Sequence, residues 1–254
     1  MEHIKILAIT QARTGSTRLP NKIFKEIQGR TLLSIHLERI LKSKRIDQLL
    51  IATTLDKDDN IIEAEANKLG IPFYRGSINN VLDRFYQAAK QYIPDWVVRL
   101  TSDCPLIDPD LLDAIIDKAI EKNVDYCANT LNPTFPDGMD VEVFKYSALE
   151  KAWKEAELDS EKEHVTPYIH KNSSFNNKNL FTSYNFLNDI DYGKVRLTVD
   201  EQSDFEVISH LIKKLGIDKD WKTYANYYLS NKEIKDLNES IKRNEGYTNS
   251  SKKD

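Results

Sequence analysis

The chain contains only two cysteines, Cys104 and Cys127, among its 254 residues. Two thiols are too few for a disulfide framework or a cysteine zinc cluster, so we expect a protein of the reducing cytoplasm. No apolar run approaches the roughly 18 residues that a membrane helix needs. The first ten residues, MEHIKILAIT, also lack the basic flank and cleavage site of a secretory signal, so we expect no membrane partner.

A large charge of either sign is absent as well. The formal net charge is −4, from 36 Lys and Arg residues against 40 Asp and Glu residues. Because nucleic-acid-binding proteins usually carry a clustered basic excess, nucleic acid is not an expected partner. Repeats and low-complexity tracts are also missing. We expect one globular domain over residues 1–243, with a small lobe at about 130–190 and a polar, disordered tail at 244–254.

Strand-like and helix-like patterns alternate through the first half of the chain. Three local signals mark helix ends: Thr31 as an N-cap, Gly70 as a C-terminal stop, and Asp108-Pro109 as a start. Four strand–helix units in series predict an α/β fold with a doubly wound, mostly parallel, Rossmann-like sheet. The strands are predicted at 4–9, 49–54, 71–74 and 96–101, and the helices at 32–41, 61–69, 81–92 and 109–120.

The second half is less regular. Two helix starts compete near residue 160, a capping box of Ser160 with Glu163 and the pair Thr166-Pro167, and the sequence leaves both open. Further capping boxes predict helices after Ser203 and after Ser230. Short strands are predicted at 124–128, 141–144 and 195–199.

An unusually polar loop follows the first predicted strand. The stretch QARTGSTRLPNK, residues 11–22, leaves that strand at the sheet edge where open α/β folds bind ligands. It matches neither the Walker A pattern nor the dinucleotide pattern G-x-G-x-x-G. A solvated basic loop is one interpretation, and phosphate binding, favoured by the position after the strand, is the other. The groups suited to a triphosphate are the flexible backbone of Gly15, the donors of Ser16 and Thr17, and the cations of Arg13, Arg18 and Lys22.

Further motifs accompany this loop in order along the chain. They are ATT (52–54), YRGS (74–77), VLDRFYQA (81–88), VVRLTSDCPLIDP (97–109), DGMDVEVF (137–144), EHVTPYI (163–169) and RLTVDEQSDFE (196–206). With them the chain resembles the acylneuraminate and KDO cytidylyltransferases from residue 4 to about 215. It is most similar to their spore-coat-polysaccharide branch, which opens with Q-A-R-x-G-S-T-R-L-P-x-K. The resemblance implies a nucleotide-diphospho-sugar transferase-like fold. Asn21 departs from it, because many relatives have glycine there.

The resemblance also implies an activity, the transfer of CMP from CTP to an anionic acceptor with release of pyrophosphate. A nonulosonic or octulosonic acid for surface glycan biosynthesis is the expected acceptor, and a phosphonate or another phosphorylated compound is the alternative. A uridylyl- or guanylyltransferase would usually carry a G-x-G-T-R loop, which is absent. A catalytically inactive nucleotide-binding subunit is the alternative from another class, but it would need no pair of metal-binding carboxylates.

Two aspartates are the candidates for a metal ion. Asp103 in LTSDCP and Asp200 in RLTVDEQSD each follow a predicted strand. Nucleotidyl transfer needs a divalent cation, and Mg2+ takes few carboxylates beside waters and phosphate oxygens. The resemblance implies that Asp103 and Asp200 hold Mg2+. The alternatives are that Asp103 only starts a turn before Pro105, and that the nearby Asp204 only favours a helix N-terminus.

Nucleotide contacts are implied by the resemblance alone. The triphosphate would lie on the opening loop, with Lys22, Arg13 and Asp103 as the catalytic residues. No local pattern decides between cytosine and the other bases. The implied nucleotide-binding residues are Ala12, Arg13, Gly15, Ser16, Lys22, Thr53, Arg75, Asn80 and Asp103.

An acceptor site is implied beside the nucleotide, around the 130–190 lobe. Alternation in DGMDVEVF puts Asp140 and Glu142 on one face of a short strand, where a solvent-facing polar stripe is the other interpretation. His164 is either a structural histidine or a base beside the acceptor. Arg196 could bind an acceptor carboxylate or phosphate bidentately. The implied acceptor-binding residues are Asp140, Glu142, His164 and Arg196.

A homodimer is also implied, because relatives are often dimers. An aromatic stripe at helical spacing, Trp221, Tyr224 and Tyr228, would either cover a partner or pack in the core, which is the commoner fate of such a stripe.

Overall fold

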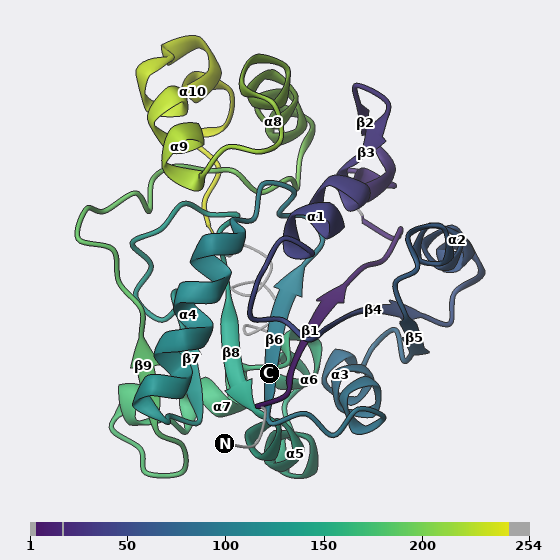
Figure 1. The fold of residues 1–254 in the computed structure, drawn as a ribbon, viewed down its shortest axis with the longest axis vertical. Coiled ribbons are helices and arrows are strands. Elements are labelled where there is room, and N and C mark those ends of the chain that lie inside the picture. Colours follow the sequence, from purple (N-terminus) through teal and green to yellow (C-terminus); the bar gives the residue numbers. More distant parts are fainter. Residues whose placement is uncertain (1–3, 17, 244–254) are drawn as a thin grey trace.

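A mixed, mostly parallel sheet forms the centre of the molecule (Figure 1). The computed structural model describes residues 4–16 and 18–243, so Thr17 and the expected tail at 244–254 lie outside it. The seven strands lie in the order β5 (Phe73–Gly76), β4 (Gln48–Thr54), β1 (Ile6–Gln11), β6 (Trp96–Thr101), β8 (Glu142–Lys145), β7 (Tyr126–Ala128) and β9 (Ser183–Asn185). Only β8 runs antiparallel to its neighbours. The predicted α/β class is confirmed.

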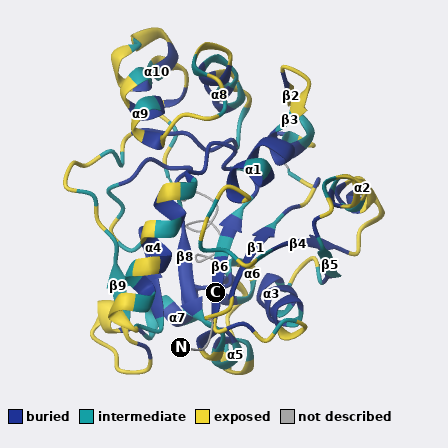
Figure 2. Cartoon of the chain, in the orientation of Figure 1, coloured by how far each residue is buried: buried dark blue, intermediate teal, exposed yellow. Residues whose placement is uncertain are grey.

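Helices cover both faces of the sheet, because successive strand residues point to opposite faces. Ala8 and Val98 face α1 (Leu32–Ile40), α4 (Pro109–Lys122), α8 (Gln202–Leu215) and α9 (Trp221–Ser230). Leu7 and Val97 face α3 (Val81–Lys90), α5 (Tyr146–Glu155) and α7 (Pro167–Lys171). Figure 2 shows the inner strands and the inward helix faces buried, whereas the edge strands β5 and β9 are half-buried. The remaining elements are α2 (Asn60–Leu69), α6 (Asp159–His164), α10 (Lys232–Asn238), the hairpin β2 (Glu26–Ile27) and β3 (Arg30–Thr31), and three 3-10 turns, η1 (Lys22–Phe24), η2 (Lys57–Asp59) and η3 (Ser174–Asn176).

Local signals place several helix ends as predicted. The Thr31 hydroxyl accepts the Ser34 N–H at 3.0 Å at the start of α1. Asp108 accepts two N–H groups at the start of α4, and Gly70 ends α2 in the left-handed region with φ 66°. The aromatic stripe is buried in the core, with Trp221 7 % exposed and Tyr224 and Tyr228 0 % exposed. In the described ranges, no helix is both long and apolar enough to cross a bilayer.

The predicted strand at 195–199 is wrong. This segment is extended, but it forms only an isolated bridge between Asp137 and Arg196 and joins no sheet. Its backbone bonds go to two different loops: Leu197 donates to Asp137 O at 2.7 Å and Val199 donates to Asp103 O at 2.8 Å. The sheet position beside β6 is taken by β8. The apolar run is therefore buried between loops, and its end lies beside Asp103.

Three predicted helix starts need correction. Near residue 160 the capping box of Ser160 with Glu163 is not formed, because α6 begins at Asp159 and Glu161 accepts the N–H of Leu158 at its start. The second signal, Thr166-Pro167, is used, because α7 begins at Pro167. Helix α8 begins at Gln202, one residue before Ser203, because Asp204 accepts the N–H groups of Asp200 and Glu201. Helix α10 is capped by Asn231, which accepts the Ile234 N–H, rather than by Ser230.

Candidate active site

A cavity of about 770 Å³ opens at the carboxyl ends of β1 and β6. Its walls come from the loops after these two strands, from β8, from α6 and α7, and from the segment that ends at Asp200. The sequence separates these parts by up to about two hundred residues, and parallel pairing of β1 with β6 brings them to one edge. Ten predicted site residues line it: Ala12, Arg13, Ser16, Lys22, Asp103, Asp140, Glu142, His164, Arg196 and Asp200.

The opening loop is held at both ends. Thr14 donates its N–H and its hydroxyl to Asp59 Oδ1 at 2.7 Å each, and Asp59 is 1 % exposed. Asn21 lies in the left-handed region with φ 54° and leads directly into η1. Asparagine is the residue type, besides glycine, that adopts this region most readily. The departure from glycine at this position therefore keeps the backbone turn that presents Lys22.

Lys22 lies between the two predicted metal ligands. Its Nζ is 3.0 Å from Asp103 Oδ2 and 2.8 Å from Asp200 Oδ1. Burial disfavours the charged form of Lys22, but the two carboxylates outweigh it and raise the pKa of the ammonium. Burial likewise opposes ionisation of Asp103, yet the Lys22 charge holds the pKa of Asp103 well below its usual value. Lys22 and Asp103 are therefore both charged at neutral pH.

Arg196 anchors the acidic side of the cavity. Its Nε and Nη2 donate to the two oxygens of Asp204 at 2.9 Å each, and its Nη1 donates to Asp137 at 2.7 Å. Its Nη2 also lies 3.1 Å from Asp200. The bidentate edge that we expected to bind an acceptor is thus occupied by Asp204. Arg196 orients Asp200 and α8 in this structure.

The acidic residues suit a magnesium ion that brings most of its own ligands. Asp103 and Asp200 approach a common point, where Lys22 is their shared partner. Over residues 4–16 and 18–243, no group of three or more His, Cys, Asp or Glu side chains is arranged to hold a metal. Two carboxylates are nonetheless enough for Mg2+, which keeps waters and binds substrate phosphates. The donor set therefore fits a nucleotide-bound Mg2+ better than a metal held by protein alone.

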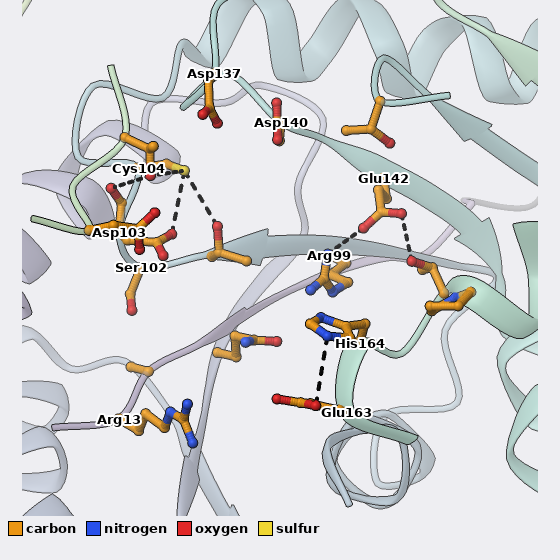
Figure 3. Close-up of a pocket in the computed structure, with 18 of the residues that line it drawn as sticks. Arg13, Arg99, Ser102, Asp103, Cys104, Asp137, Asp140, Glu142, Glu163 and His164 are labelled. Carbon is orange, nitrogen blue, oxygen red and sulfur yellow. Dashed lines mark hydrogen bonds and ion pairs between the residues drawn. The ribbon is translucent and has the colours of Figure 1, made fainter. Parts of the chain in front are cut away.

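The opposite side of the cavity carries a buried ion pair. Arg99 in β6 faces Glu142 in β8 and donates to it through Nη1 (Figure 3). Glu142 also accepts the Tyr126 hydroxyl and the Thr166 hydroxyl, the latter at 2.7 Å. At 6 % exposure, Glu142 is not part of a solvent-facing stripe. Burial and the Glu142 charge raise the pKa of Tyr126 far above its usual value.

Comparison with known proteins agrees with this arrangement. Residues 7–249 match the model of the cytidylyltransferase family. The chain belongs to that family. It is 41% identical over 244 residues to an uncharacterized protein of Methanocaldococcus jannaschii, covering 94% of this chain and 97% of the relative. It is 33% identical over 225 residues to the spore coat polysaccharide biosynthesis protein SpsF of Bacillus subtilis, covering 83% and 88%. The resemblance to the spore-coat branch is confirmed.

Solved structures share the fold of this cytidylyltransferase. A cytidylyltransferase from Leptospira borgpetersenii matches with a TM-score of 0.85 at 35% identity, covering 91% of this chain and 97% of that one. A CMP:2-keto-3-deoxy-manno-octonic acid synthetase complexed with CTP matches with a TM-score of 0.59 at 16% identity, covering 83% and 99%. The second likeness shows the fold alone, and it confirms the expected nucleotidyltransferase architecture.

Four predicted nucleotide contacts of the cytidylyltransferase do not line the cavity: Gly15, Thr53, Arg75 and Asn80. Arg75 donates to Thr54 O at 2.8 Å and to Asn60 Oδ1 at 2.6 Å, so its guanidinium joins β4 to α2. Asn80 caps α3 by accepting the Asp83 N–H at 2.9 Å. Thr53 is fully buried in β4. The structure thus gives Arg75 and Asn80 clear structural contacts outside the cavity.

Sequence reasoning missed Arg99 and His36. The sequence did contain a sign that Arg99 belongs to a site, because Arg99 is the one charged residue inside the strand WVVRLT. His36 lies in the helix predicted at 32–41, and no sequence motif links it to a partner. Its ring is fully buried between Thr10 Oγ1 and Cys104 O, at 2.8 Å from each. Burial lowers the pKa of His36 to about 4, so the ring is neutral at pH 7, donates from Nδ1 to Cys104 O and accepts from Thr10. His36 therefore holds the turn that carries Asp103.

Proposed function

We propose that this cytidylyltransferase transfers CMP from CTP to an anionic acceptor, a nonulosonic or octulosonic acid, and releases pyrophosphate in a Mg2+-dependent reaction. The observation that supports this most is the convergence of Asp103 and Asp200 on Lys22 at the sheet edge. A B. subtilis relative named for spore coat polysaccharide biosynthesis supports a role in surface glycan formation. We expect the reaction in the cytoplasm.

The opening loop would bind the triphosphate. Arg13 is exposed beside the cavity and makes no ion pair with the described residues, so its guanidinium is available to phosphate oxygens. Ser16 lines the same wall. Lys22 would turn from the two aspartates toward the phosphates when a nucleotide arrives. Mg2+ on Asp103 and Asp200 would supply charge neutralisation for the departing pyrophosphate.

The acceptor would enter from the side of Glu142 and His164. Burial, the largest cause, lowers the pKa of His164. The Glu163 carboxylate opposes this shift and the Arg99 charge adds to it, so the ring is neutral at pH 7. A neutral imidazole at the cavity wall can accept a proton from an acceptor hydroxyl as it attacks the α-phosphorus. The rest of catalysis would be positioning and electrostatic stabilisation.

Transfer of CMP to a phosphonate is the second candidate. Arg13, Arg84 and Arg99 all line the cavity, and three guanidinium groups suit a phosphonate as well as a carboxylate. A catalytically inactive nucleotide-binding subunit is the third, and the paired Asp103 and Asp200 count against it, because nucleotide binding alone does not require both carboxylates.

Pyrophosphate release separates these candidates. The four nucleoside triphosphates are each combined with 3-deoxy-octulosonate, N-acetylneuraminate and 2-aminoethylphosphonate, with and without Mg2+. We expect release only with CTP, Mg2+ and an acidic sugar.

Asp103→Asn should lower turnover by about 100-fold or more while unfolding at the same temperature, and the exposed Asp117→Asn is the matched control. Near-normal turnover of Asp103→Asn would end the metal assignment, and the absence of pyrophosphate release with every acceptor would favour the inactive subunit.

A further inference from the structure

Arg99 has a hydrogen-bonding edge that no group among the described residues uses. Its Nη1 donates to Glu142, but its Nε–H is buried without a partner. Among the described residues, no group accepts from its Nη2 either. Nε and Nη2 form the edge of a guanidinium that binds two oxygens side by side. Buried polar side-chain atoms without a partner are uncommon in native proteins and call for an explanation.

Arg196 shows what the same edge does when it is filled. Its Nε and Nη2 donate to the two oxygens of Asp204 at 2.9 Å each. Arg99 lines the same cavity with the equivalent edge unoccupied. At Arg196 this pair of N–H donors binds the carboxylate of a side chain. At Arg99 the same pair of donors can therefore bind the two oxygens of a ligand.

The position of the Arg99 guanidinium is rigidly determined. Arg99 and Glu142 lie opposite each other on neighbouring strands. Glu142 cannot readily turn away, because the hydroxyls of Tyr126 and Thr166 also bind it. The side chains of Arg99 and Glu142 are 16 % and 8 % exposed. A preoriented, mostly desolvated guanidinium binds an anion more strongly than a mobile surface arginine does.

The surroundings of Arg99 favour an anion on the acceptor side. Figure 3 shows Arg99 between Glu142 and His164, with Asp103 on the other side of the cavity. Arg13 and Arg99 both act on the pKa of His164 through their charge, which indicates that these cations share one region. Glu142, the carboxylate that pairs with Arg99, already accepts from Arg99, Tyr126 and Thr166. An incoming oxyanion would thus meet cations and lie away from the proposed metal.

We propose that the Nε/Nη2 edge of Arg99 binds the oxyanion of the acceptor, a carboxylate or a phosphonate, and that Glu142 is the positioning residue for Arg99. The identity of this ligand as the acceptor rests on the proposed function, whereas the binding of an oxyanion at Arg99 does not. The bidentate binding of the acceptor anion, which we expected at Arg196, is thereby assigned to Arg99.

Two variants test this assignment. Arg99→Lys keeps a cation beside Glu142 but has no side-on edge, and the double variant Arg99→Met/Glu142→Gln removes both buried charges together, which guards against misfolding. With whichever acceptor supports pyrophosphate release, carboxylate or phosphonate, we expect the acceptor KM to rise about 100-fold in both variants. The KM for CTP should stay within about twofold of the parent value, because Arg99 does not touch the nucleotide in this proposal. The exposed Arg30→Met is the matched control. An acceptor KM of Arg99→Lys equal to that of the parent, or a rise confined to the KM for CTP, would overturn the assignment.

A second experiment does not depend on turnover. Crystals of the parent protein and of the double variant are soaked in selenate, whose anomalous signal locates the anion. Selenate within hydrogen-bond distance of Arg99 Nε and Nη2 in the parent, and absent from the double variant, supports the oxyanion site even where no acceptor is turned over. No selenate at Arg99 in the parent overturns it. Failure of every acceptor with selenate bound at Arg99 would therefore contradict only the proposed function.

Discussion

Lys22 is the residue on which the proposed chemistry depends most directly. Asp103 and Asp200 lie close enough to share one ammonium group, at 3.0 Å and 2.8 Å from its Nζ. Without that charge the two carboxylates would repel each other in a partly desolvated site. A divalent cation at the same place would do what Lys22 does now, so a bound metal would compete with the ammonium for the two aspartates.

Replacing Lys22 by methionine should therefore have two effects. Turnover should fall by about 100-fold or more, because a cation that stabilises the departing pyrophosphate is lost. Binding of Mn2+ in the absence of nucleotide should tighten, because the ammonium no longer competes for Asp103 and Asp200. Steady-state kinetics and Mn2+ electron paramagnetic resonance measure these effects, with the exposed Lys44→Met as the control. Unchanged Mn2+ binding, together with an effect on CTP affinity alone, would count against this role.

At the scale of elements, the segment 195–200 brings Asp200 to Asp103 without belonging to the sheet. It is held by backbone hydrogen bonds to two loops, one of them at Asp103 and two at Asp137. The next residue, Gly138, adopts φ 104°, and a Cβ there would lie 2.6 Å from Leu197 C and from Thr198 N. The close approach of two backbones, rather than a strand ladder, therefore determines where Asp200 lies.

Gly138→Ala should displace this segment. The added Cβ meets backbone atoms and the φ value is strained for alanine, so we expect a loss of about 3 kcal/mol or more in the free energy of unfolding. Gly70→Ala is the matched control, because Gly70 also has positive φ but has open space around it, and it should cost about 1 kcal/mol. Urea denaturation compares the two. Equal losses would show that Gly138 matters only for its φ value.

At the scale of the whole molecule, His36 connects three parts of the fold. It lies in α1 and binds β1 through Thr10 and the turn after β6 through Cys104 O. The ring is fully buried and its pKa is lowered to about 4, from 6.5, by burial. Between these two pH values the unfolded chain binds a proton at His36 that the folded protein does not bind, so the contribution of His36 to stability falls as the pH falls.

This linkage predicts a pH dependence of unfolding. The free energy of unfolding should decrease by about 3 kcal/mol between pH 6.5 and pH 4 through His36 alone, and it should be independent of His36 above pH 7. His36→Gln, which can form similar hydrogen bonds but cannot titrate, should show a flatter profile over this window. Urea titrations at intervals between pH 4 and 7.5 measure both proteins. Parallel profiles would contradict a neutral, buried His36.

Periodicity and capping in the sequence determined the elements with strong local signals. The strand at 96–101 and the start of α4 after Asp108 were predictable because the interactions that define them span a few residues. The motifs also pointed to Asp103, Lys22 and Asp200, which the structure brings together. Only tertiary structure decided that 195–199 joins no sheet, that Arg75 contacts α2 and not the cavity, and that Glu142 is buried against Arg99. These outcomes depend on which distant segments compete for the same neighbours, and local sequence does not encode that competition.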